Sequence, residues 1–120
     1  MAAGEFELRK EYRLRKRPEF ESLRTEALKV ASRHLLVLLK ENNKDTSRLG
    51  ITVSTKIDKL AVGRNRFKRT IREVFRVNRH RLSQHFDIVV IARKNATQCS
   101  FEDIRREFLG ALYHNKFLTY

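Results

Sequence analysis

The residues with the clearest capacity for chemistry are cationic and amide side chains, which are concentrated in residues 56–81. This stretch holds ten of the 27 lysines and arginines of the chain and only two acids. Most of the ten are arginines, whose guanidinium carries a planar fork of donors that fits phosphate oxygens and base edges. In the tripeptide Arg64-Asn65-Arg66, an amide that both donates and accepts stands between two such groups. The chemistry that these residues offer is the binding of a polyanion.

The spacing of apolar residues in the same stretch predicts a helix that positions the cations. One side of this helix is apolar and would enter the core: Phe67, Ile71, Val74, Phe75 and Leu82. An arc of about 100° on the opposite side is polar and comprises Asn65, Lys68, Arg69, Arg72, Arg76 and Arg79. Like charges at i, i+4 repel one another, so this face favours a bound anion. Free backbone amides at the start of the helix can also bind one.

A solvated surface is the ordinary interpretation of charged residues on a helix, but such a surface mixes charges of both signs. The formal net charge of +13 and the pI near 10.6 make a polyanionic partner the better explanation. The alternative to nucleic acid is an anionic membrane. The longest apolar runs, residues 35–39 and 88–92, are far shorter than the roughly 20 residues that span a bilayer. With no recognisable targeting segment, we expect a cytoplasmic nucleic-acid-binding protein without membrane contact.

No catalytic or metal-binding constellation is evident in the sequence. The four histidines are scattered without the spacing of metal ligands: His34, His80, His85 and His114. No cluster of carboxylates suits a two-metal nuclease, so Glu73 and Asp87 are interpreted as structural or ion-pairing, with a metal ion held jointly with the phosphates of a bound nucleic acid as the open alternative. The only cysteine, Cys99, is expected to be an unreactive thiol in a reducing compartment. We therefore predict no catalytic residue and no cofactor bound by the protein alone.

Composition and helix-end signals predict one domain with three helices. A chain of 120 residues with 41% hydrophobic content suits one core, with residues 1–11 as a poorly structured extension and 12–120 as the domain. Pro18 suits the first turn of a helix over residues 17–27. Ser100, with Asp103 at the third helical position, suits the cap of the last helix. That helix would bury Ile104, Phe108 and Leu112, and Phe117 is a further candidate.

Three strands are predicted between these helices. Residues 34–40 and 86–92 are nearly continuous apolar runs and read as buried strands. The middle strand alternates apolar with small or hydroxylated residues: Leu49-Gly50-Ile51-Thr52-Val53-Ser54. The order is helix, strand, strand, helix, strand, helix, which predicts an α+β fold with helices packed against a sheet.

Several segments of the chain together resemble the bacterial ribonuclease P protein subunit. Residues 61–73 (AVGRNRFKRTIRE) resemble its Arg-Asn-Arg signature. Residues 48–54 (RLGITVS) and 87–94 (DIVVIARK) resemble the strands before and after that helix, and residues 12–16 (YRLRK) with Phe20 resemble its amino-terminal segment. The resemblance covers about residues 12 to 117, in the family's order and spacing.

Membership of this family implies a two-layer α/β sandwich with a left-handed βαβ crossover, a fold shared with the second domain of ribosomal protein S5. General handedness rules would predict the opposite sense for the crossover. Three residues depart from the family pattern: Arg24, Leu38 and Thr55. The first two often have apolar or aromatic counterparts, so stacking on a base would fall to Phe20. From its helical spacing, Phe20 is equally suited to the core.

The resemblance implies a protein that binds the catalytic RNA of ribonuclease P and the 5′ leader of precursor tRNA. The RNA, with metal ions such as magnesium, would hydrolyse the leader, so the protein would belong to an enzyme without supplying a catalytic residue. A second copy of the chain is not required. We expect eight residues to bind RNA: Lys56, Arg64, Asn65, Arg66, Lys68, Arg69, Arg72 and Arg76. Arg76 is added because it belongs to the polar face of the helix. Those expected in the leader cleft are Phe20 by resemblance, and Thr52 and Ser54 from the small hydroxylated strand face.

Two other classes of function remain open. A general basic RNA-binding or ribosomal protein could have the same charge and fold, although the signature helix between these two strands is not expected of one. A DNA-binding regulator would present mixed polar residues for reading the major groove, whereas this helical face is almost purely cationic.

Overall fold

The computed structural model describes residues 12–14 and 17–114. The helices and strands follow the order α1 (Arg17–Glu26), β1 (Leu28–Ala31), β2 (Leu35–Glu41), β3 (Arg48–Thr52), α2 (Ala61–Asn78), β4 (Phe86–Ala92) and α3 (Phe101–His114). Two short 3-10 turns, η3 (Arg79–Arg81) and η4 (Ala96–Gln98), follow α2 and β4. This is the predicted α+β class, with one strand more than the sequence indicated.

The four strands form one sheet in the order β1-β2-β4-β3. Strand β2 pairs antiparallel with both β1 and β4, whereas β3 pairs parallel with β4. Because β3 and β4 are parallel neighbours, the chain must cross over the sheet through α2 between them. The crossover implied by the family resemblance is therefore present, and its left-handed sense stays a prediction.

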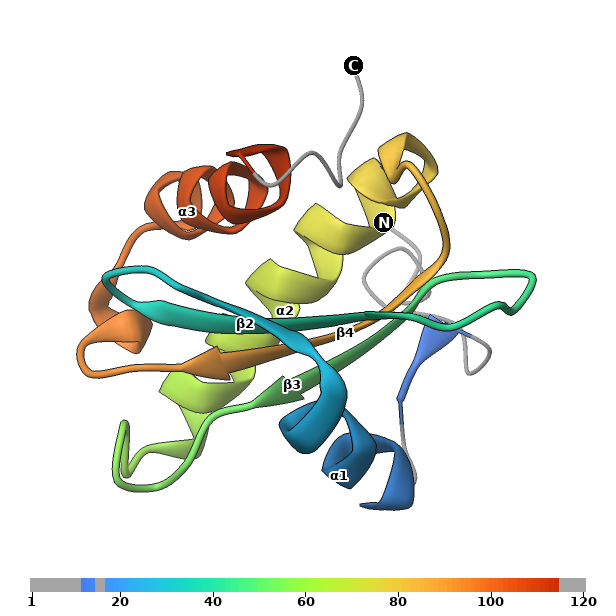
Figure 1. The fold of residues 1–120 in the computed structure, drawn as a ribbon. Coiled ribbons are helices and arrows are strands. Elements are labelled where there is room, and N and C mark those ends of the chain that lie inside the picture. Colours follow the sequence, from blue (N-terminus) through green and yellow to red (C-terminus); the bar gives the residue numbers. More distant parts are fainter. Residues whose placement is uncertain (1–11, 15–16, 115–120) are drawn as a thin grey trace.

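Helices cover both faces of the sheet (Figure 1). Helices α2 and α3 lie on one face, where Ile71 and Phe108 pack with Val37, Ile88 and Val90 in the main core. Helix α1 lies on the other face, where a smaller cluster includes Leu14, Leu23, Leu38 and Val89. Side chains alternate across a strand, so the apolar runs of β2 and β4 serve both clusters. The predicted sandwich is confirmed, and α1 adds partial cover on the second face.

Strand β1 was not predicted, because its four residues are too few to show a period. Its burial is slight, with only Val30 partly buried. The strand exists because it pairs antiparallel with residues 36–39 of β2, from Leu28 opposite Leu39 to Ala31 opposite Leu36. This pairing with the next strand of the chain leaves no pattern within the four residues of β1 themselves.

Helix α3 holds the turn between β1 and β2 in place. The carboxylate of Glu107 accepts hydrogen bonds from the Ser32 hydroxyl and from the backbone N–H of His34. Its second oxygen lies 2.9 Å from Nδ1 of the His34 ring. Burial by itself raises the pKa of Glu107. The hydrogen bonds and the nearby histidine together lower it by more than burial raises it, so the pKa lies below its ordinary value. The ionised carboxylate thus contributes to stability.

The helix-end predictions are mostly confirmed. Pro18 lies in the first turn of α1, and the Ser100 hydroxyl accepts a hydrogen bond from the Asp103 N–H at 3.1 Å. Helix α2 ends at Asn78, so the prediction that it continues to Leu82 was wrong. The chain tightens there into η3, whose cap is Leu82.

The middle strand is also shorter than predicted. Strand β3 ends at Thr52, and the carbonyl of Ser54 accepts the backbone N–H groups of Ile57 and Asp58 in a turn. Ser54 is exposed in that turn. The prediction that Ser54 belongs to a polar strand face was therefore wrong, while Gly50 and Thr52 do share one face of β3 by alternation.

Candidate nucleic-acid interface

Helix α2 divides into the two faces expected from its sequence. Phe67, Ile71 and Val74 are at most 3% exposed and pack in the main core. On the opposite side, Asn65 and Arg69 are exposed, and Lys68 and Arg72 are half-buried. None of these four polar side chains forms a hydrogen bond or ion pair that joins it to another described residue. The helix thus presents donors that a polyanion can use.

A hollow of about 200 Å³ lies between α1, α2 and β3. It is lined by Arg13, Leu14, Phe20, Leu49, Gly50, Ile51, Lys68 and Arg72. Three of these side chains are cations and one is aromatic. Phosphate and nucleobase groups are the natural complement of such a lining.

Gly50 and Phe20 shape the wall of this hollow together. A Cβ atom added at Gly50 would lie 2.7 Å from both Cε1 and Cζ of the Phe20 ring. The ring therefore occupies the space that any larger residue at position 50 would need. Phe20 is half-buried and also packs against the smaller core cluster. It therefore belongs partly to the core and also lines the hollow, while its role in stacking on a base stays a prediction.

Arg13 reaches the hollow through a short β-bridge. Its segment pairs in parallel with β3, and the Leu14 N–H donates to the carbonyl of Leu49 at 2.9 Å. The pKa of Arg72 is lowered, mainly by burial and to a smaller extent by the positive charge of Arg13. Within the described residues, Nε of Arg13 is buried without a hydrogen-bond partner. An anion bound in the hollow would offset the repulsion between these two guanidinium groups, and the sequence had not indicated Arg13 as a site residue.

The two arginines of the signature tripeptide donate to backbone carbonyls. Nη1 of Arg64 lies 2.9 Å from the carbonyl oxygens of both Asp58 and Lys59. Nη2 of Arg66 lies 2.9 Å from the carbonyl of Thr97, which lies in η4. These arginines therefore connect the loop before α2, the helix itself and η4. Each guanidinium keeps further donors, because it carries five N–H groups.

Asp58 stands at the start of α2. Its Oδ1 accepts the Leu60 N–H at 2.9 Å. This bond, followed by the hydroxyl of Thr97, lowers the pKa of Asp58, and the charges of Arg64 and Arg66 contribute as well. A Cβ at Gly63 would lie 2.0 Å from Oδ2 of Asp58, so the glycine makes room for the carboxylate. An internal carboxylate therefore already occupies one of the amides at the helix start, and binding of an external anion by the others stays a prediction.

Two further cations of the predicted face have partners within the protein. Arg76 pairs with Glu73 at 2.6 Å, so its charge is not left to repel its neighbours as predicted. Arg79 lies in η3 and not in α2, and its guanidinium is 4.0 Å from the centre of the Tyr12 ring. The cationic face is therefore concentrated between Asn65 and Arg72.

Three other residues named from the sequence lie in the loop before α2, at the end of β3 and in the middle of β2. Lys56 is exposed in the loop before α2, and Thr52 is half-buried at the end of β3. Leu38, where the family often carries an aromatic residue, is 2% exposed beneath α1. Leu38 therefore cannot offer a surface to a ligand.

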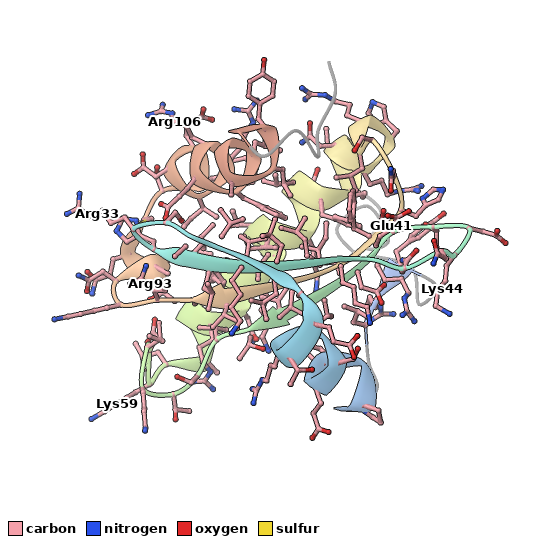
Figure 2. All side chains as sticks on the ribbon, viewed as in Figure 1. Arg33, Glu41, Lys44, Lys59, Arg93 and Arg106 are labelled. Atoms are coloured by element: carbon pink, nitrogen blue, oxygen red, sulfur yellow. The ribbon has the colours of Figure 1, made fainter. Side chains whose placement is uncertain are left out.

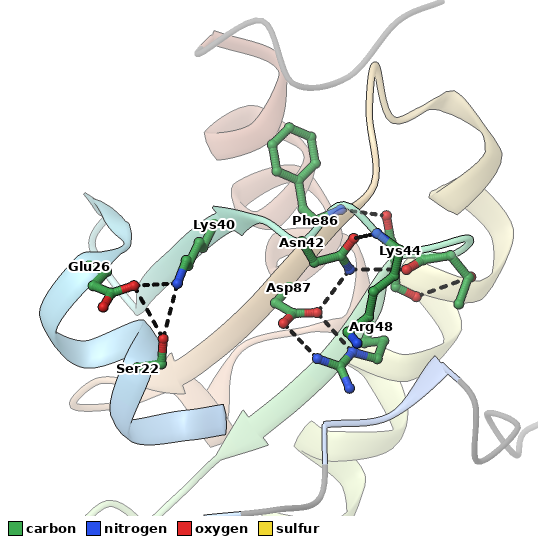
Figure 3. A network of polar contacts seen from close by, with 10 residues as sticks. Ser22, Glu26, Lys40, Asn42, Lys44, Arg48, Phe86 and Asp87 are labelled. Atoms are coloured by element: carbon green, nitrogen blue, oxygen red, sulfur yellow. Dashed lines mark hydrogen bonds and ion pairs between the residues drawn. The ribbon is translucent and has the colours of Figure 1, made fainter. Parts of the chain in front are cut away.

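Two groups of polar contacts lie side by side at the start of β3 and the end of β2 (Figure 3). Arg48 donates to both oxygens of Asp87, at 2.9 and 2.8 Å, and Asn42 donates to the same carboxylate at 2.9 Å. Beside them, Nζ of Lys40 contacts the Glu26 carboxylate and the Ser22 hydroxyl of α1. The structural role predicted for Asp87 is confirmed, and the Lys40 contacts connect α1, which carries Phe20, to β2.

Among residues 12–14 and 17–114, no group of three or more metal-ligating side chains is close enough to hold a metal ion. In the same part of the chain, no helix is long and apolar enough to cross a membrane.

Comparisons with a family model and with individual proteins indicate the same family. Residues 8–116 match the sequence model described as Ribonuclease P. The ribonuclease P protein component of Desulfosudis oleivorans is 46% identical over 109 residues, covering 91% of this chain and 88% of that protein. The component from Bacillus pumilus is 41% identical over 100 residues, covering 82% and 83%.

Solved structures agree in fold. The RNase P protein of Staphylococcus aureus superposes with a TM-score of 0.82 at 35% identity, covering 90% of this chain and 98% of that one. The RNase P protein of Thermotoga maritima gives 0.76 at 37% identity, covering 85% and 96%. The chain therefore belongs to the ribonuclease P protein family.

Proposed function

We propose that this chain is the protein subunit of a ribonuclease P ribonucleoprotein, binding the catalytic RNA and the 5′ leader of precursor tRNA. The observation that carries the proposal, beside the family, is the cationic face of α2 next to a hollow that contains Arg13, Lys68, Arg72 and Phe20. A backbone phosphate fits the three cations, and an unpaired base fits the aromatic ring.

In this proposal, the outer side of α2 contacts the catalytic RNA and the side facing the hollow contacts the leader. Asn65 and Arg69 are exposed on the outer side, where with Arg66 and Lys56 they would contact the catalytic RNA. The half-buried Lys68 and Arg72 face the hollow, where they would neutralise phosphates of the leader. Thr52 lies on the same strand face as Gly50 and leaves room for a sugar-phosphate chain beside Phe20.

Hydrolysis is assigned to the RNA and its metal ions. Magnesium prefers carboxylate, phosphate and water oxygens, but the described residues that line the hollow offer guanidinium, ammonium and apolar groups. These side chains do not fit a magnesium ion, so no step of the reaction is derived through one held by the protein. The protein contributes charge neutralisation and substrate position. It would act in the cytoplasm, and one copy suffices for these contacts.

The test is cleavage of a 5′-extended precursor tRNA at low magnesium by a bacterial ribonuclease P RNA, with and without the protein. Correct cleavage that depends on the protein, with none by the protein alone, is the expected result. Tight RNA binding without rescue would instead favour a general RNA-binding or ribosomal protein. Cleavage by the protein alone would place a catalytic site within this chain and refute the proposal.

A further inference from the structure

Three consecutive apolar residues are exposed at the start of α2: Leu60, Ala61 and Val62. Leu60 is 70% exposed and Val62 is 77% exposed, more than any other large apolar side chain among the described residues. Isolated exposed apolar residues are common, but a run of three is unfavourable in water unless it makes a contact. We refer to residues 60–62 as the apolar tip.

The apolar tip is held by hydrogen bonds on both sides. Asp58 accepts the backbone N–H of Leu60, and the guanidinium of Arg64 donates to the carbonyls of Asp58 and Lys59. Gly63 leaves the space that the Asp58 carboxylate fills. The exposure of the tip is thus built into the fold, and little conformational entropy remains to be lost on binding.

Cations surround the apolar tip. The exposed cations near it in the sequence are Lys56, Lys59, Arg66 and Arg69, and Asn65 adds an exposed amide. Lys59 points away from the body of the protein (Figure 2). Asp58 is the only acid between residues 55 and 70, and its Oδ1 is already occupied by the Leu60 amide. A partner must therefore combine negative charge with apolar surface, as RNA does with its phosphates, riboses and base faces.

We propose that the apolar tip packs against base and ribose surface of the catalytic RNA, while the surrounding cations hold the phosphates on either side. The inference rests on the proposed function and adds an uncharged contact to it. Apolar side chains press against bases in other nucleic-acid complexes. Unpaired bases and the shallow minor groove of RNA offer such surfaces. The tip would fix where the cationic helix sits on the RNA, since phosphate contacts carry no sequence information.

The test compares the affinity of the catalytic RNA for wild-type protein and for the double variant Leu60→Ser/Val62→Ser over a range of salt concentrations. Losing two apolar contacts should weaken binding roughly ten- to a hundredfold, with the salt slope unchanged. The matched control is Val77→Ser, on the last turns of the same helix and 49% exposed, which should bind like wild type. Arg69→Ala should instead reduce the slope by about 0.7 to 0.9.

Two outcomes would overturn the inference. One is a double variant that binds the RNA as tightly as the Val77→Ser control. The other is a weakened double variant whose salt slope also falls, because the tip would then only position the cations. Val62→Thr, which keeps the branched shape, guards against loss of folding and should show a smaller loss in the same direction. Failure of the wild-type protein to bind the RNA would refute the proposed function itself.

Discussion

Replacing Gly50 with alanine tests whether Phe20 is held against β3 as the structure shows. The new Cβ would lie 2.7 Å from two atoms of the Phe20 ring and 3.3 Å from Cβ of Leu14. Carbon atoms in contact normally lie about 3.5 to 4.0 Å apart, so the ring must shift by about 1 Å. Overpacking of this kind costs about 1–3 kcal/mol. Reduced freedom of the unfolded chain offsets roughly 0.5–1 kcal/mol of that cost.

The structure therefore predicts that Gly50→Ala destabilises the protein when the Phe20 ring is present and does not when the ring is removed. In wild type, the free energy of unfolding should fall by about 1 kcal/mol or more. In a Phe20→Ala background the main clash is gone, and the same substitution should be neutral or stabilise by up to about 0.5 kcal/mol. Urea denaturation of the wild type, both single variants and the double variant measures this coupling. An equal effect of Gly50→Ala in both backgrounds, within about 0.5 kcal/mol, would refute the assigned contact.

The same four proteins test the role of the hollow. A displaced Phe20 ring would narrow the space beside Lys68 and Arg72, so Gly50→Ala should weaken binding of precursor tRNA with a leader. Binding of tRNA without a leader to the same ribonucleoprotein provides the control and should change little. Equal losses for the two substrates would place the leader elsewhere.

Three further predictions concern charged groups. Asp87→Ala removes the carboxylate to which Arg48 and Asn42 donate and should lower the free energy of unfolding by about 2 kcal/mol, with Asp87→Asn less affected in the same urea assay. The pKa of Glu107 in the folded protein is lowered. The stability that this carboxylate contributes is therefore complete at pH values above its ordinary pKa, and it is lost as the pH falls through the folded pKa. Thermal melts in acid should thus show a steeper loss for wild type than for Glu107→Gln, and parallel curves would contradict this. Arg72→Ala should reduce the salt slope of RNA binding by about 0.7 to 0.9. Arg76→Ala should reduce it less, because an acid already pairs with Arg76; the reverse ranking would count against the assigned interface.

Local patterning was sufficient where an element depends on its own residues. The apolar stripe of α2 repeats at helical spacing, and the Ser100 cap of α3 bonds a residue three positions later, so both could be predicted within a few residues. The end of α2 could not, because the chain turns into η3 with no proline or glycine at the boundary. Strand β1 was missed for a related reason: its four residues become a strand only by pairing with β2.

The sequence by itself determined the charge, the two-faced helix and the family to which the chain belongs, because these depend on composition, period and the order of motifs. Only the tertiary structure decided which cations meet. It brought Arg13 beside Arg72 through the bridge to β3, placed the Phe20 ring over Gly50, and gave Arg64 and Arg66 backbone partners. It also left Leu60 and Val62 outside the core. These contacts join residues far apart in the chain or depend on loop geometry, and side-chain periodicity carries no information about either.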